Sequence, residues 1–475
     1  MEFDALLLSR IQFGFVIAFH ILFPAFTIGL AAFLAVCEGM WLRTGREVYK
    51  GLYLHWVKIF ALAFAMGVVS GVVMSYQFGT NWSVFADRTG SVLGPLLGYE
   101  VLTAFFLEAT FLGVMLFGWN KAGRKLHFAA TCAVAIGTSI SAFWILSANS
   151  WMQTPQGFAV DPVTGNFYAT DWLKVIFNPS FPSRYVHMML AAYATTAAVV
   201  LAAGAWQILR GQNSEPTQWQ IRMAALTLAA VMPFQIAAGH WSGEVAHEHQ
   251  PAKIAVVEAW CDTKAVQGTA IVAWPADNEC GLASVEIPGT SPLLFPKANG
   301  DLQGLDAFDA SETPPIWIPF WSFRIMVAAG LAMLALGVWG LFLWWRRRID
   351  QPGLFHWLAV PGGSLGFIAV LTGWMVAEVG RQPYTVYGHL RTEDSVAPVE
   401  TAAVATSLLV FMVVYAIVFT AGSVYMARIA TRGFTDDPTD TPRGERRAPG
   451  SPLGAVDDPA EELPPETAVA DRRKN

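Results

Sequence analysis

The chain has 475 residues, of which 54% are hydrophobic and only 14% are charged, and its mean hydropathy is +0.42. Soluble domains carry roughly 25% charged residues, so the composition excludes a soluble protein and indicates an integral membrane protein. The formal net charge of −6, without a basic surface, gives no indication of nucleic-acid binding.

Nine apolar stretches follow one another, and each is long enough to cross a hydrocarbon core of ~30 Å as a helix. They lie near residues 11–40, 53–79, 93–119, 127–150, 184–209, 219–240, 319–345, 356–378 and 401–428. The first is too long for a signal peptide and lacks a cleavage site, so we expect a retained helix. The predicted fold is an all-α membrane domain of nine transmembrane helices over residues 1–432.

The placement of Lys and Arg predicts the orientation of these helices. Eleven Lys and Arg residues lie in four short loops, whereas the other four loops contain only eight although they are together more than three times as long. Positively charged loops favour the cytoplasmic side. We therefore expect the N-terminus outside and the C-terminus in the cytoplasm. The basic loops are 41–52, 120–126, 210–222 and 346–355.

Three segments are predicted to lie outside the helices. The loop 151–184 carries turn signals and could form a short hairpin or an irregular cap. The loop 241–318 is too long for a simple connector and indicates a functional segment; Cys261 and Cys280 within it could form a disulfide in an oxidising compartment. The tail 433–475 is rich in Pro and charged residues and is predicted to be disordered.

His187 and Met326 are candidate axial ligands of a buried haem. Each lies about one turn inside an apolar segment that starts on the outer side, and their depths differ by roughly 6 Å. His and Met together form a low-spin electron-transfer ligand pair. The alternative is that His187 is an interfacial residue and that Met326 fills a gap in the core, as most buried methionines do.

Further ionisable residues lie inside the apolar segments, where each suggests a function because its charge is costly in a bilayer. His20 is near the middle of the first segment, although a lone histidine there is more often a packing residue. Glu100 and Glu108 are eight residues apart, about 80° around an α-helix and ~12 Å along it. This spacing suits a proton relay, and the alternative is a pair of polar groups that hold helices together.

Polar residues in two later segments can also be explained either by a functional role or by a structural one. Residues 127–150 carry a polar stripe that could continue a water-filled path, or could only bond back to its own helix. Glu378 ends the eighth segment, three residues before Arg381. The simplest interpretation of this pair is a salt bridge. The stripe consists of Thr138, Ser139, Ser141, Ser147 and Asn149.

Five motifs in order along the chain resemble subunit I of cytochrome bd-type quinol oxidases. The resemblance spans nearly all of residues 1–430. The motifs are GTNWS at 79–83, AFFLEATF at 104–111, WMQ at 151–153, FRIMVA at 323–328 and GWMVAEVGRQP at 373–383.

Position by position, the resemblance implies a complete set of haem sites. His187 and Met326 would ligate a low-spin haem b, with Arg324 beside its propionates. His20 and Glu378 would be axial ligands of two high-spin haems that form the oxygen-reducing pair, namely haem b with either haem d or a second haem b. Three further residues are implied near this pair: Glu100 as an adjacent carboxylate, Glu108 on the proton path, and Trp374 as a haem contact.

The stretch QPAKIAVVE at 250–258 resembles the quinol-binding loop of the family. Lys253 and Glu258 match its quinol-interacting residues, and a carboxylate suits quinol oxidation because each phenolic proton needs a base. The loop is of the short form. Many members of the family have an acidic residue after the glycine that opens the loop, whereas this chain has His240. In this respect the chain resembles the cyanide-insensitive subgroup, in which a haem b can replace haem d. Tyr384 stands where the family usually has Trp.

The resemblance implies a terminal quinol:O2 oxidoreductase of a bacterial inner membrane. Ubiquinol or menaquinol would be oxidised at the periplasmic loop, and O2 would be reduced to water with cytoplasmic protons, which generates a proton motive force without pumping. Subunit II would be a partner, and a small single-helix subunit could be another. Two other functions are alternatives. A proton-coupled transporter would be expected to contain an inverted repeat, and none is visible in the sequence. A cytochrome b membrane anchor would not need His20, Glu100 and Glu378 in addition to the low-spin haem site.

Overall fold

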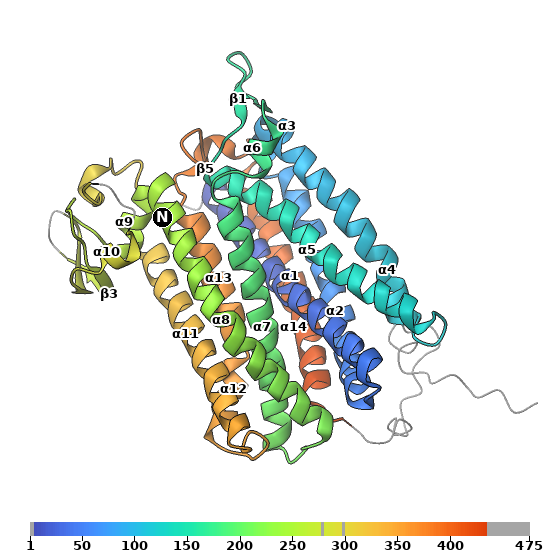
Figure 1. Cartoon of the computed structure of the whole chain (residues 1–475). Coiled ribbons are helices and arrows are strands. Elements are labelled where there is room, and N and C mark those ends of the chain that lie inside the picture. The colour runs from blue at the N-terminus through green and yellow to red at the C-terminus, as the bar shows by residue number, and fades with distance from the viewer. Residues whose placement is uncertain (1–3, 277–279, 297–299, 435–475) are drawn as a thin grey trace, which may run out of the picture.

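The computed structural model describes residues 4–276, 280–296 and 300–434. Among these residues, nine helical segments are long and apolar enough to cross a membrane, as the sequence predicts, and Figure 1 shows them packed side by side. Five are single helices: α1 (Ala5–Thr44), α2 (Glu47–Phe78), α5 (Arg124–Gln153), α8 (Glu215–His249) and α11 (Trp317–Trp345). A sixth, α14 (Thr401–Thr431), closes the described bundle.

The other three segments are interrupted. They are α3 (Ser83–Glu100), the π-helix η1 (Val101–Phe105) and α4 (Phe106–Phe117); α6 (Trp172–Ile176) and α7 (Phe181–Leu209); and α12 (Leu354–Gly362) and α13 (Leu365–Val379). Helices suit this environment because they satisfy their own backbone hydrogen bonds without water.

Local sequence signals set where the first helix begins and ends. The Asp4 side chain accepts a hydrogen bond of 2.7 Å from the Leu7 backbone N–H and so caps α1. The helix stops at Gly45, whose φ of +68° is in the left-handed region that glycine adopts without strain. The predicted tail 433–475 lies outside the described residues, except for its first two positions.

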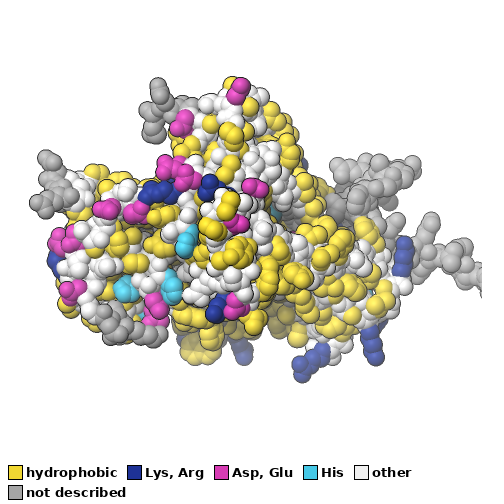
Figure 2. Space-filling model, turned by 90° about the horizontal axis from the view of Figure 1, so that it is seen from above, with side chains coloured by type: hydrophobic (Ala, Val, Ile, Leu, Met, Phe, Trp, Pro, Cys, Tyr) yellow, Lys and Arg dark blue, Asp and Glu magenta, His cyan; other side chains and the backbone are white. Residues whose placement is uncertain are grey.

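Most of the extramembrane structure lies at one end of the bundle, here called the loop end, where α1 also begins (Figure 1). Strands β1 (Phe158–Val160) and β2 (Phe167–Ala169) form an antiparallel hairpin, one of the two forms predicted for this loop. Strands β5 (Tyr384–Val386) and β6 (Leu390–Arg391), followed by η3 (Glu393–Ser395), form a second hairpin. Figure 2 shows acidic and histidine side chains among hydrophobic ones on this face.

The long loop begins later than the apolar pattern predicts, because α8 continues to His249 beyond the hydrophobic stretch. Hydrophobicity marks only the part of a helix that contacts lipid, and a helix can extend into water. The loop then forms α9 (Pro251–Glu258), the antiparallel pair β3 (Thr269–Pro275) and β4 (Leu282–Ile287), α10 (Ser291–Leu294) and η2 (Leu305–Ala307).

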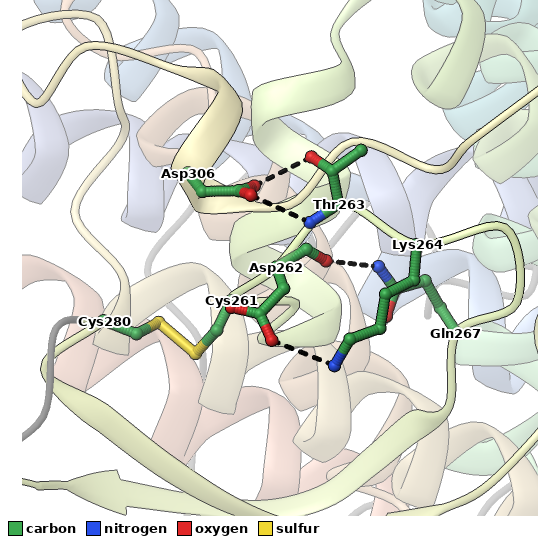
Figure 3. The surroundings of a disulfide bond; sticks show 7 residues. All are labelled: Cys261, Asp262, Thr263, Lys264, Gln267, Cys280 and Asp306. Atoms are coloured by element: carbon green, nitrogen blue, oxygen red, sulfur yellow. Dashed lines mark hydrogen bonds and ion pairs between the residues drawn. A yellow bond between two sulfur atoms is a disulfide. The ribbon is translucent and has the colours of Figure 1, made fainter.

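Cys261 and Cys280 form a disulfide across this loop (Figure 3), so the pairing suggested by their location is found. Beside it, the Asp306 carboxylate accepts hydrogen bonds of 2.8 and 3.1 Å from the Thr263 hydroxyl and backbone N–H. Gly304 lies so close to this turn that a Cβ there would be 2.4 Å from the Asp262 carbonyl carbon. The loop is therefore a folded unit that contacts the bundle through α9 and β3.

Close helix packing relies on small residues, as is usual between helices in membranes. A Cβ at Gly29 of α1 would be 2.4 Å from the Ala192 carbonyl oxygen of α7, and one at Gly337 of α11 would be 2.6 Å from the Ala229 nitrogen of α8. Helices α7 and α11 each pack against both α8 and α13. These four helices form a group that is called the α7/α8/α11/α13 group below.

Candidate functional site

His187 lies near the loop end of α7 and faces α8. Its Nδ1 atom is buried and makes no hydrogen bond within the described part of the chain. Its Nε2 atom is 3.4 Å from Nε2 of Gln235, and a Cβ on Gly239 would lie 3.1 Å from its Cε1 atom. The imidazole therefore packs tightly against this glycine of α8, where a Cβ would fit only if the ring shifted.

Met326 lies near the loop end of α11 and faces α13. A Cβ at Gly373 would be 2.9 Å from the Met326 sulfur, so this glycine makes room for the thioether in the same way as Gly239 does for His187. Trp374, the next residue after Gly373, is half-buried. Since α7 and α11 both pack against α8 and α13, the structure places both predicted ligands in one four-helix group, at the same end.

His20 lies on α1 against α2, and its hydrogen bond defines which ring nitrogen is free. The Ser70 hydroxyl donates its single hydrogen to the Gly67 carbonyl at 2.9 Å, so it must accept from His20 Nδ1, which is 3.0 Å away. The proton is then on Nδ1, and Nε2 carries the lone pair that an iron ligand needs. A Cβ at Gly71 would be 3.1 Å from His20 Cε1.

Glu100 and Glu108 face the same side of α5. Ser141 donates a hydrogen bond of 2.8 Å to Glu100 Oε1, and a Cβ at Gly137, one turn away from Ser141, would be 2.7 Å from Glu108 Cγ. Glu108 is buried, and its Oε1 accepts no hydrogen bond from the described residues. The π-helix η1 lies between the two residues, and a π-helical turn contains more residues than an α-helical turn. The 80° expected for a continuous α-helix therefore does not apply to this pair.

The polar stripe on α5 divides into two kinds of residue. Ser141 and Asn149 contact the carboxylates of Glu100 and Glu378. Thr138 and Ser139 instead donate to the Ala135 carbonyl of their own helix, which is the commoner role. Only part of the predicted stripe therefore belongs to the site.

Glu378, at the end of α13, is the centre of a buried polar cluster. Its Oε1 atom accepts hydrogen bonds from Asn149 Nδ2 at 3.0 Å and from Gln153 Nε2 at 3.2 Å, and its Oε2 atom pairs with Arg381 at 2.6 Å. Arg184 lies 3.9 Å from Oε1. The predicted Glu378–Arg381 salt bridge is present, but it is one contact among several.

Cations outnumber carboxylates in this cluster. The guanidinium groups of Arg184 and Arg381 each retain buried N–H groups without a partner among the described residues, and Lys253 Nζ joins them through Gln153. Burial lowers the pKa of Lys253 well below its usual range, and Arg184 lowers it further while Glu378 opposes the shift. Unsatisfied buried N–H groups are costly, so the cluster has capacity for a further anionic group.

Lys253 and Glu258 lie on α9 but have different neighbours. Five residues separate them, about 140° around the helix. Lys253 points to Gln153 and the end of α13, whereas Glu258 Oε2 is 3.5 Å from Arg324 Nη2 on α11. The structure therefore does not bring these two predicted quinol residues to one position.

Glu258 and Arg324 connect the long loop to α11. Arg324 donates to the Ala270 carbonyl at 2.6 Å and to the Val257 carbonyl, and its guanidinium lies 3.8 Å above the Phe320 ring. Glu258 Oε2 is buried and accepts no hydrogen bond of good geometry from any described residue. Burial raises the pKa of Glu258 to about 7, although Arg324 opposes the shift. The carboxylate is thus suited to exchange a proton near neutral pH.

The residues present fit haem better than a bare metal ion. No group of three or more His, Cys, Asp or Glu side chains is arranged to hold a metal ion among residues 4–276, 280–296 and 300–434. Axial haem ligation needs only one or two side chains per iron. Gln235 Nε2 can only donate, so His187 Nε2 carries the lone pair, as His20 Nε2 does. These two histidines and the glycines beside His20, His187 and Met326 agree with that requirement.

Sequence reasoning missed several residues around these sites. Arg184 and Gln153 lie beside Glu378 together with the predicted Asn149, and three glycines make room for the candidate ligands. A signal existed for Arg184, since an arginine at the edge of an apolar segment is costly unless it is paired. The glycines carried no such signal, because glycine is common in membrane helices.

These features together define a multi-pass helical membrane protein with buried candidate haem ligands and a folded loop at one end. The family model for cytochrome bd terminal oxidase subunit I matches residues 8–434. The chain belongs to the cytochrome bd terminal oxidase subunit I family, and it is accordingly a respiratory quinol oxidase subunit, part of an oxidoreductase that reduces O2.

Named relatives cover nearly the whole chain. Cytochrome bd ubiquinol oxidase subunit 1 of Bacillus subtilis (strain 168) is 34% identical over 87% of this chain and 90% of its own length. Cytochrome bd-II ubiquinol oxidase subunit 1 of Escherichia coli (strain K12) is 30% identical, over 90% and 97%. The structure of bd oxidase from Geobacillus thermodenitrificans matches with a TM-score of 0.82 and 29% identity, over 90% of this chain and 98% of that one.

Proposed function

We propose that this chain is the haem-bearing catalytic subunit of a terminal oxidase that oxidises quinol at the loop end and passes the electrons to O2 inside the bundle. The observation that carries the proposal is the position of Arg324. It lies 3.5 Å from the Glu258 carboxylate of the loop and two residues before Met326 on α11. One turn of α11 therefore contacts the candidate quinol base through Arg324 and carries the candidate haem ligand Met326.

His187 and Met326 would hold a low-spin haem b, with Arg324 beside its propionates. His20 and Glu378 would hold the two high-spin haems, haem b with either haem d or a second haem b, and the family resemblance supports Trp374 as a contact. When bound, such haems supply one-electron transfer and O2 reduction. The unpartnered guanidinium N–H groups of Arg184 and Arg381 would suit haem carboxylates.

Glu258 would accept the phenolic protons as quinol is oxidised, since its carboxylate is buried and has a pKa of about 7. Lys253 is implied by the resemblance as a second quinol residue. Relatives of this chain are named as ubiquinol and as menaquinol oxidases; we accordingly propose quinol as the substrate class.

Glu108 and Glu100 would deliver protons to the oxygen site from the opposite end of the bundle. Both face α5, and Ser141 already bonds to Glu100. The excess of Lys and Arg in the short loops favours that end as cytoplasmic, which makes the loop end periplasmic. Quinol protons released outside and protons taken up inside would generate a proton motive force across a bacterial inner membrane without pumping.

Members of this family work as a membrane complex with subunit II. We propose the same partner here, with a small single-helix subunit as a third component. The function is tested on the purified complex by haem extraction with pyridine haemochrome analysis, together with quinol-driven O2 uptake. We expect low-spin and high-spin haem and O2 uptake. A complex without haem would favour the transporter, and low-spin haem alone would favour the electron-transfer anchor.

A further inference from the structure

Three side chains from two separate segments meet at the loop end and are called the Glu312 cluster here: Glu312, Tyr384 and Arg391. Glu312 lies in the connection between η2 and α11, whereas Tyr384 is on β5 and Arg391 is on β6. The Tyr384 hydroxyl donates to Glu312 Oε2, and the Arg391 guanidinium donates to Glu312 Oε1. Both oxygens of one loop carboxylate are therefore bound by a hairpin that follows 72 to 79 residues later in the chain.

Further contacts strengthen this cluster. Arg391 also donates to the Ser311 carbonyl at 3.4 Å, and its guanidinium lies 5.5 Å from the centre of the Tyr384 ring. The hydrogen bond to Glu312 raises the pKa of Tyr384, so the phenol stays protonated and remains a donor. The side chains of Arg391 and Glu312 are 32% and 37% exposed. Water screens a single ion pair at such a position, so the cluster depends on several donors that share one carboxylate.

The β5–β6 hairpin is a fixed support for Glu312. The Tyr387 backbone N–H donates to the Met152 carbonyl of α5 at 3.0 Å. The Thr392 hydroxyl donates at 2.8 Å to Gln382 Oε1, just beyond the end of α13. The rings of Tyr384 and Tyr387 pack edge to face, with their centres 5.7 Å apart. The hairpin is thus joined to α5 and to the end of α13.

The loop side of the cluster is less regular. The Asp306 backbone N–H of η2 donates to the Cys261 carbonyl at 3.1 Å, so the folded part of the loop extends to η2. Residues 308–316 then lead to α11 through turns and irregular structure. The Glu312 cluster therefore lies in the connection between the folded part of the loop and the helix that carries Arg324.

We propose that Glu312 is a positioning residue for quinol oxidation, because the Glu312 cluster holds the end of the quinol loop against the β5–β6 hairpin. The same loop carries Lys253, which contacts α13, and Glu258, which contacts Arg324 of α11. These two quinol residues keep their positions only while the loop stays between the two helices. Tyr384, which stands where the family usually has Trp, supplies one of the contacts. This inference rests on the proposed oxidation of quinol at the loop end.

The first test is Glu312→Ala in the purified complex, which removes both acceptors of the cluster. A loop that is correctly placed for only about a tenth of the time would show an apparent KM for quinol about tenfold higher. We expect that increase with an unchanged kcat, the pattern of a lost binding contact. O2 uptake with an artificial donor that bypasses the loop, and the absorption of all haems, should be unchanged.

A conservative variant should give a graded result. Glu312→Gln keeps the size of the side chain but replaces one acceptor by a donor. Because Tyr384 and Arg391 both donate, one of them must then lose its partner. The KM of Glu312→Gln should therefore lie between those of the wild type and Glu312→Ala.

Tyr384→Phe tests whether the cluster acts as a unit, because it removes only the hydroxyl and keeps the ring beside Tyr387. It should raise the KM for quinol, and the double variant with Glu312→Ala should be no worse than Glu312→Ala alone, because both changes break the same contact. Hydrogen exchange of the backbone of residues 308–316 should become faster in each variant. The matched control is Asp309→Asn, since Asp309 is an exposed carboxylate of the same segment.

Three results would overturn the proposal. The first is a normal KM for quinol in Glu312→Ala. The second is an equal loss of quinol-driven and artificial-donor O2 uptake, which would place the defect in folding or in the haem sites. The third is an additive effect of Glu312→Ala and Tyr384→Phe. Failure of the proposed function would look different, because Glu258→Gln would then retain normal quinol turnover.

Discussion

At the scale of single residues, three of the four candidate ligands share one structural feature, which is a glycine on the neighbouring helix. His20 faces Gly71, His187 faces Gly239, and Met326 faces Gly373. A larger residue at any of these glycines would displace the ligand, because membrane helices pack too closely to absorb a side chain.

Met326→Leu tests the low-spin site, because it retains the volume of the side chain and removes the thioether. We expect loss of the low-spin b absorption, with the high-spin haems largely retained, and a fall in quinol oxidase turnover of at least about tenfold, in line with the loss of a metal-site contact. Absorption spectra of the purified complex measure this. An unchanged low-spin spectrum would exclude Met326 as a ligand.

Glu258 gives a prediction of pH dependence. Its pKa is raised to about 7, and a base acts only when it is deprotonated, so quinol turnover should rise as the pH increases through about 7. Glu258→Gln should remove this dependence and lower quinol turnover on the order of a hundredfold. O2 uptake with an artificial donor that bypasses the loop should persist. A parallel loss with both donors would place the defect in the haem sites or in folding.

At the scale of elements, α5 is the helix that connects the proposed proton path to the oxygen site. Gly137 lies against Glu108, Ser141 bonds to Glu100, and Asn149 bonds to Glu378. The π-helix η1 turns Glu100 and Glu108 toward this helix together. π-helical turns are rare and occur frequently at functional sites.

Glu108→Gln tests this path, because it preserves the shape of the side chain but cannot ionise. Quinol-driven O2 consumption should fall on the order of a hundredfold, while the first reduction of the low-spin haem by quinol should continue at its normal rate. Stopped-flow spectra and an oxygen electrode separate the two steps. Thr138→Val is the matched control on α5, since Thr138 bonds only to its own helix. Normal turnover of Glu108→Gln would remove Glu108 from the path.

At the scale of the whole molecule, the two ends of the bundle differ in charge and in folded structure. The loop end carries the hairpins, α9 and the disulfide-linked strands, whereas the opposite end has short loops rich in Lys and Arg. This asymmetry predicts that quinol chemistry and proton uptake occur on opposite sides of the membrane.

Two cysteine reporters test that orientation. Val163, at the tip of the β1–β2 hairpin, is 91% exposed, and Lys121 is exposed in the α4–α5 loop at the opposite end. A membrane-impermeant thiol reagent should label Val163→Cys in spheroplasts, and Lys121→Cys only after the membrane is opened. Labelling in the reverse order would invert the orientation and place the quinol loop in the cytoplasm.

The sequence alone determined the nine helices and the candidate ligands, because hydrophobic length, charge asymmetry and motif identity are properties of consecutive residues. The tertiary structure decided which side chains meet. The π-helical turn changed the relation of Glu100 to Glu108, and α9 directed Lys253 to Gln153 and Glu258 to Arg324. Such contacts depend on the rotation of each helix and on the neighbour it packs against, and both are set by close packing between segments far apart in the chain.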